Sequence, residues 1–265
     1  MDNCKKLQRK IKMAKIRTII MQILIVVSFF LLWELCSSVG ILNEFLFSKP
    51  SKIFKLLVIY INNNQIWKHI AISLYETILG IVIGSTAGIF IAILLWYNRR
   101  IAKLLEPFMV VLNALPKTAL APIMIIWAGA GVTGIVVVAI SILIVITVIS
   151  TYNYFINVDS EKIKMIQAFK ASKLQIFTKL VFPSNLTNII NVIKINIGMS
   201  WIGVIVGEFL VSSAGIGYLI MYGGQVFKLD LVMMGVLILA ILAYGMYAIV
   251  DLIEKYLIKK RGKGI

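Results

Sequence analysis

The stretch between Lys117 and Asp159 contains no Asp, Glu, Lys or Arg, and this limits what the chain can fold into more than any other feature. It is much longer than the roughly 20 apolar residues that cross a bilayer once. Gly129, Gly131 and Gly134 lie within it and predict a turn. We therefore expect the stretch to belong to two successive membrane spans.

The rest of the chain has the same character. Hydrophobic residues make up 60% of it and charged residues 14%, whereas a soluble domain has roughly 45–50% apolar and about 25% charged residues. The first apolar run follows a basic segment, as in a signal peptide, but shows no small-x-small cleavage pattern, so a retained span is expected. The prediction is an all-α polytopic membrane protein with six transmembrane helices, at about 18–38, 71–96, 105–128, 133–155, 189–211 and 231–254.

The distribution of Lys and Arg predicts the orientation. Of the 27 Lys and Arg residues, twenty fall in segments on the N-terminal side of the membrane and five on the other side, with Lys117 and Lys194 inside or at the ends of spans. Because cytoplasmic loops collect Lys and Arg, both termini are expected in the cytoplasm. The net charge of +16 then reflects orientation rather than nucleic-acid binding. Cys4, Cys36 and the single His69 provide neither a disulfide framework nor a metal site.

A basic, amphipathic segment, KIKMIQAFKASKLQIFTKLVFPS (162–184), lies between the fourth and fifth spans. Asp159 and Ser160 predict a helix start, Lys170-Ala171-Ser172 a break into two short helices, and Pro183 the end of the second. The segment could lie on anionic lipid headgroups, or it could insert apolar side chains into a groove of a cytosolic protein. Its apolar residues recur three to four apart, a helical stripe: Ile163, Ile166, Phe169, Leu174, Phe177 and Val181.

Polar and helix-breaking residues inside the spans are candidate pathway residues. Pro107, Pro116 and Pro122 interrupt the third span, either to line a pathway or only to kink a packed helix. Lys117 at membrane depth costs at least about 2.5–3.5 kcal/mol, so it should face a wet cavity, pair with an acid or reach an interface.

Glu208 follows a run of glycines that lets helices approach closely. It could pair with Lys117 or Lys194, or lie at the outer mouth. Its role could be structural, or it could act as a gate or contact the substrate. Gly215 and Gly217 predict a turn that leads into a short re-entrant helix on the outer side. Glu34 and Glu76 are expected near outer span ends in structural roles.

Several of these segments resemble the permease subunits of bacterial ABC importers, in the nitrate/sulfonate/taurine branch. The family's loop pattern E-A-A-x-x-x-G, followed by Leu-Pro, corresponds here to Lys164-Met165-Ile166, Lys170 and Phe182-Pro183. Lysine at the glycine position is expected to forgo a positive φ, so the bend between the two short helices should differ from the family's. Four further stretches carry the resemblance over roughly residues 31 to 257: FSKPSKIF (47–54), SLYETILG (73–80), LLEPFMVVLNALPKTALAPIMIIWAGAG (104–131) and GMSWIGVIVGEFLVSSAGIGYLI (198–220).

The resemblance implies a MetI-like permease fold in the bacterial plasma membrane and a pathway for a small solute, such as a nitrate-, sulfonate- or taurine-type anion or a vitamin precursor. The implied partners are two cytosolic ABC ATPase subunits, an extracytoplasmic binding protein, a second copy of the chain and the lipid bilayer. No catalytic residue, metal or cofactor is expected on this chain. ATP and Mg²⁺ would be bound by the ATPase, since the sequence has no G-x-x-x-x-G-K-[ST] motif.

The same resemblance assigns segments and residues. It implies a basic N-terminus (1–17), a permease domain (18–257) with coupling helices at about 159–181, and a basic tail (258–265). The residues expected to couple to the ATPase are Ile163, Ile166, Phe169, Lys170, Ala171, Ser172, Leu174, Phe177 and Pro183. Those expected along the pathway are Leu115, Pro116, Lys117, Pro122, Trp201, Glu208, Gly215 and Gly217.

Two other classes are considered. A membrane-embedded enzyme would need a clustered catalytic set, and one histidine with scattered acids does not supply it. An ion-coupled secondary transporter or a channel should show an inverted repeat or a selectivity filter, and the sequence shows neither.

Overall fold

The structure, a computed structural model, describes the backbone of residues 2–261 and the side chains of 13–14 and 16–259. All regular structure in this part of the chain is helical. Of the predicted tail, only 262–265 lie outside the described residues. Among the described residues, five helices are long and apolar enough to cross a membrane: α1 (Asp2–Ser38), α4 (Gln65–Tyr97), α7 (Val132–Ile156), α11 (Leu186–Val211) and α13 (Leu229–Arg261).

These five helices contain five of the predicted spans, with somewhat wider bounds. The remaining predicted span, 105–128, is broken. It comprises α5 (Arg99–Ala114), a 3-10 turn η1 (Lys117–Leu120) and α6 (Ala121–Ala128), bent by 81°. The described part of the chain therefore has six spans only if this bent pair counts as one.

The three prolines of the third span have different positions, and only one lies at the break. Leu115 is extended, with ψ 134°, as the residue before a proline prefers. The helix axis changes direction at Pro116. Pro107 lies inside α5, and Pro122 lies in the first turn of α6, where its missing N–H costs nothing. The expectation that all three prolines interrupt the span is therefore wrong: only Pro116 does so.

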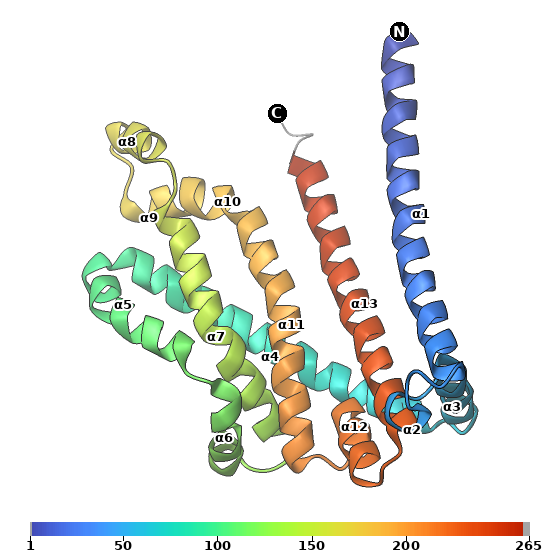
Figure 1. The fold of residues 1–265 in the computed structure, drawn as a ribbon. Coiled ribbons are helices and arrows are strands. Elements are labelled where there is room, and N and C mark those ends of the chain that lie inside the picture. Colours follow the sequence, from blue (N-terminus) through green and yellow to red (C-terminus); the bar gives the residue numbers. More distant parts are fainter. Residues whose placement is uncertain (1, 262–265) are drawn as a thin grey trace.

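A tightly packed core of α4, α7 and α11 forms the centre of the molecule (Figure 1). Small residues let the three backbones approach, as in other membrane bundles: a Cβ added to Gly84 would meet Leu143, and one added to Gly203 would meet the Ala139 backbone. Polar side chains also link the helices. The Asn196 amide of α11 donates to Ser85 Oγ of α4 (2.8 Å) and Thr147 Oγ1 of α7 (2.8 Å).

A second layer surrounds one end of this core. It consists of α3 (Pro50–Asn62), α12 (Ile216–Gln225) and the start of α13, packed around Ile53, Ile216 and Leu231, with α2 (Glu44–Phe47) in contact with α13. Glu44 bridges Lys49 (2.6 Å) and Lys52. Hydrogen bonds from these two lysines lower the pKa of the Glu44 carboxyl to about 2. Ion pairing thus joins α2 to the beginning of α3.

The helix termini and short helices gather at two opposite ends of the bundle (Figure 1). The start of α1, the end of α13 and the short helices α8 (Ser160–Ala168) and α9 (Lys173–Ile176) lie at one end, and α2, α3 and α12 lie at the other. In α1, the apolar window has none of its residues buried inside the structure.

Candidate coupling and translocation sites

The segment between α7 and α11 forms two short helices joined by a tight turn. Asp159 caps α8, its Oδ1 accepting from the Glu161 N–H (2.9 Å). Lys170 has φ 57°, and its N–H donates to the Gln167 carbonyl (2.8 Å). The lysine therefore adopts the left-handed conformation that glycine would favour, and the expectation that it forgoes a positive φ is wrong. The caps on either side fix the turn, although this conformation costs a non-glycine residue roughly 1–2 kcal/mol.

The second short helix begins with a capping box at Ser172. Its hydroxyl accepts from the Gln175 N–H (3.3 Å), and the Gln175 side chain accepts from the Ser172 N–H (2.8 Å), which satisfies two free donors at once. The helical path then continues through a π-helical turn, η2 (Phe177–Val181), and α10 (Phe182–Ser184). Pro183 lies in the first turn of α10. The path ends at Ser184, before the turn at Asn185 that leads into α11, so the end predicted at Pro183 is confirmed to within one residue.

The apolar stripe divides into an inner and an outer part. Phe177 is only 8% exposed and packs on Trp96 (5.0 Å between ring centroids) and edge-on to Phe155 (5.4 Å). Ile163 and Ile166 pack against the same cluster. The prediction that Phe177 enters a partner's groove is therefore wrong, because this side chain covers the ends of α4 and α7. Two other members of the stripe remain outside: Phe169 is 81% and Leu174 61% exposed.

A lysine ties α9 to the end of α4. Lys173 Nζ donates to the Tyr97 carbonyl (2.5 Å) and lies 4.9 Å from the centroid of the Tyr97 ring. A cation at the C-terminus of a helix satisfies a free carbonyl and complements the helix dipole. Together with the Phe177 contacts, this places α9 and η2 in direct contact with the ends of α4 and α7.

At the opposite end, Glu208 of α11 holds the start of α12. Its carboxylate accepts from the Gly217 N–H (2.5 Å), the Tyr218 N–H (3.4 Å) and the Ser73 hydroxyl (2.5 Å). Ser73 Oγ in turn accepts from the Ile216 N–H (2.8 Å). The initial N–H groups of a helix have no partner within the helix, and here side chains from α4 and α11 supply those partners.

His69 completes this cap, and the sequence did not reveal it. Its Nδ1 lies 2.9 Å from the Gly215 amide nitrogen and 3.1 Å from the Gly215 carbonyl oxygen, so it pairs with the backbone of Gly215 in either tautomer. The predicted turn at Gly215 and Gly217 is present. Gly215 has φ 120°, and a Cβ on either glycine would overlap the Glu208 side chain. Glu76 is also buried here, and its carboxyl group contacts that of Glu208.

The predicted ion pairs of Glu208 are absent from the described part of the chain. Lys194 instead bridges Asp251 (2.7 Å) and Glu254 of α13. Lys117 Nζ lies 3.4 Å from the Asn113 carbonyl, next to the bend. The expectation that Glu208 pairs with either lysine is therefore wrong, because hydroxyl and backbone donors satisfy its carboxylate.

The pathway candidates fall into three separate places. Glu208, Gly215 and Gly217 meet at the start of α12. Trp201 is buried in one cluster with Ile81 and Ile197, inside the bundle. The remaining four lie at the bend between α5 and α6: Leu115, Pro116, Lys117 and Pro122.

The helical fold, with its broken third span and capped outer helix, defines a polytopic membrane protein. Residues 80–263 match the model of the family described as binding-protein-dependent transport system inner membrane component, and the chain belongs to this family. It is the transmembrane permease subunit of an ABC importer and a multi-pass component of the bacterial plasma membrane.

The names of curated relatives agree with this assignment to ABC transporter permeases. The chain is 27% identical to a probable ABC transporter permease protein of Haemophilus influenzae, covering 86% of this chain and 93% of the relative. It is 28% identical to the putative aliphatic sulfonates transport permease protein SsuC of Bacillus subtilis (87% and 83%). It is 25% identical to the formylaminopyrimidine transport permease protein ThiX of Halalkalibacterium halodurans (71% and 74%).

A solved structure shows the same fold. An inward-facing MetNI methionine ABC transporter chain superimposes with a TM-score of 0.59, at 17% identity, over 75% of this chain and 97% of that chain. The expected MetI-like permease fold is confirmed.

Proposed function

We propose that two copies of this chain form the pathway of an importer that is driven by two cytosolic ABC ATPase subunits and supplied by an extracytoplasmic binding protein. The end with α8 and α9 would face the cytoplasm. ATP and Mg²⁺ would bind to the ATPase and no cofactor to this chain, a view supported by the lack of a P-loop motif in the sequence. The positive-inside count supports the orientation.

The exposure of Phe169 and Leu174 carries this proposal. Both are large apolar side chains at the tip of the α8–α9 turn, 81% and 61% exposed. Capping at Asp159 and Ser172 holds the turn in one conformation. Exposed apolar side chains on a fixed helical element are typical of docking into a groove of a partner.

The inner face of the same segment supplies a mechanical link. Phe177 packs on α4 and α7, and Lys173 bonds to the end of α4. Movement of the docked turn would therefore move the central spans with it, as in rigid-body hinge or shear transitions. The contacts of Ile163 and Ile166 with the same cluster extend this link to α8.

A small anion or a vitamin precursor is the proposed class of solute. Relatives are named for aliphatic sulfonates, taurine, formylaminopyrimidine and riboflavin. Lys117 lies at the bend of the third span, without an acidic partner among the described residues. A cation beside the pathway would favour an anionic solute.

The docking role can be tested with Phe169→Asp. Affinity of the purified permease for its ATPase should fall about tenfold or more, as expected for an apolar anchor at an interface. Phe227→Asp is the matched control, because Phe227 is also an exposed phenylalanine (71%) in a positive-φ turn, at the other end of the bundle. Equal ATPase affinity of Phe169→Asp and the parent would contradict the proposal.

A further inference from the structure

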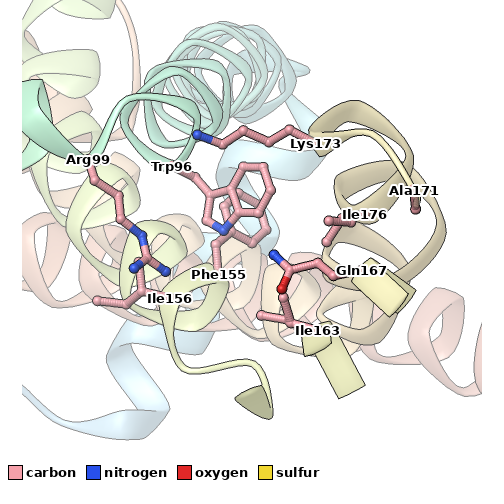
Figure 2. A pocket seen from close by; sticks show the side chains of 9 residues that line it. All are labelled: Trp96, Arg99, Phe155, Ile156, Ile163, Gln167, Ala171, Lys173 and Ile176. Carbon is pink, nitrogen blue, oxygen red and sulfur yellow. The ribbon is translucent and has the colours of Figure 1, made fainter. Parts of the chain in front are cut away.

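A pocket of about 390 Å³ lies beneath the α8–α9 turn, beside the ends of α4 and α7 (Figure 2). Arg99 and Lys173 line it together with Trp96 and Gln167, and no acidic residue does. Within the described part of the chain, no hydrogen bond or ion pair involves the Arg99 guanidinium. The Lys173 ammonium donates one hydrogen bond, to the Tyr97 carbonyl. The pocket thus offers unused cationic donors beside an indole ring.

A second, entirely apolar groove of about 230 Å³ lies among α4, α5 and α7. Its lining includes Leu95 of α4, Phe108 and Leu112 of α5, and Ile144 and Val148 of α7.

The pocket and the groove follow the same segments of the chain. Trp96 comes directly after Leu95, and Arg99 begins α5, whose later residues line the groove. On α7, Phe155 of the pocket and Ile144 of the groove are eleven residues apart. They therefore share one face, at about 16 Å along the helix axis. That distance is close to half of the roughly 30 Å hydrocarbon core of a bilayer.

We propose that an anionic phospholipid binds along this path, with its phosphate at Arg99 and Lys173 and one acyl chain in the apolar groove. Basic pockets at the cytoplasmic ends of transmembrane helices suit such headgroups, and Trp is enriched at this membrane level. A free phosphate would leave the groove empty. The headgroup would link α5 to α9, while Phe169 and Leu174, which do not line the pocket, would stay free for the ATPase.

Native mass spectrometry of the purified permease, with phosphatidylglycerol or phosphatidylcholine added, tests this proposal. Arg99→Gln with Lys173→Gln should lower retention of phosphatidylglycerol by about fivefold for each cation removed. Arg100→Gln with Lys103→Gln removes the same charge from exposed positions that do not line the pocket, and should retain the lipid like the parent. Equal losses in both double variants, or no loss in the first, would overturn the proposal.

The acyl chain and the source of the phosphate are tested separately. Ile144→Phe fills part of the groove and should lower retention although both cations remain, with Tm recorded to confirm folding. Inorganic phosphate and glycerol phosphate in excess should not displace the lipid; displacement by either would show a free-anion site and overturn the lipid assignment. Loss of the dimer in Ile144→Phe would instead assign the groove to a second copy of the chain. Neither result depends on ATPase binding, so the docking role of Phe169 is judged independently.

Discussion

Lys170 and Gly215 both have positive φ angles at the ends of short helices, but they occur for different reasons. Gly215 has no room for a side chain, because Glu208 occupies the space where a Cβ would lie. Lys170 is exposed on the surface of the α8–α9 turn, so only its backbone conformation is unfavourable. At Lys170 glycine would relieve strain, whereas at Gly215 glycine is required by packing.

The first prediction concerns this strain. Lys170→Gly should stabilise the permease by about 1 kcal/mol, because the cost of a left-handed side-chain-bearing residue is removed. Thermal unfolding in detergent would show a raised Tm. Lys164→Gly is the control: Lys164 lies inside α8, where glycine should lower stability by about 0.5–1 kcal/mol. A lower Tm for Lys170→Gly would contradict the strain argument.

A second prediction concerns the cap of α12. Gly217→Ala should destabilise the protein by about 1–3 kcal/mol, as overpacking does, because the added methyl group collides with Glu208. Gly224→Ala in the same helix meets nothing within 4 Å and should be neutral or slightly stabilising. Hydrogen exchange across 215–225 should rise only in Gly217→Ala. Equal exchange in the two variants would argue against a close fit at Glu208.

At the scale of elements, polar side chains fix how neighbouring helices sit on one another. Asn196 joins three central helices, Glu208 joins α11 to α12, and Lys194 joins α11 to α13. Each link involves groups that would be costly to bury alone. Shape alone therefore does not set the register between these helices.

The third prediction tests the link between α11 and α13. Lys194→Met should lower the Tm clearly, because it leaves Asp251 and Glu254 without their shared cation. Lys255→Met removes a cation that pairs with Asp251 alone and is 71% exposed, so its effect should be small. Similar Tm values for the two variants would show that the partly buried bridge at Lys194 adds little to stability.

Local sequence patterns predicted most of the elements. Apolar length located the spans, Asp159 marked the start of α8, and Gly215 marked the turn before α12. Periodicity showed the stripe through Phe177 but could not show that this side chain faces α4 and α7, because a stripe does not specify what covers it. The cap formed by His69 and Ser73 could not be predicted from local patterns either, since these residues lie more than 140 positions from the start of α12 in the sequence.

On the scale of the whole molecule, the two ends of the bundle have different structural features. One end has the exposed α8–α9 turn, the start of α1 and the end of α13, and the other has the capped helix α12 beside α3 (Figure 1). The tightly packed core of α4, α7 and α11 connects them. This arrangement lets events at one end reach the other through continuous helices.

Orientation is tested by labelling. In a background with both native cysteines replaced by serine, a cysteine at Lys164 should resist an impermeant thiol reagent on intact cells. One at Phe227 should react, because it lies at the opposite end. Both positions should react after the cells are opened. Labelling of Lys164→Cys on intact cells would place the α8–α9 turn outside and remove the basis for ATPase docking.

The π-helical turn at Phe177–Val181 has a consequence for how chain length can vary. Such a turn holds one residue more than the α-helical path it replaces. Deleting one residue there would leave an ordinary helix but rotate the preceding segment by about 100° and shift it by about 1.5 Å relative to α11. Phe169 would then point in a new direction. A homologue that lacks one residue at this place would thus keep the fold but present a different docking geometry.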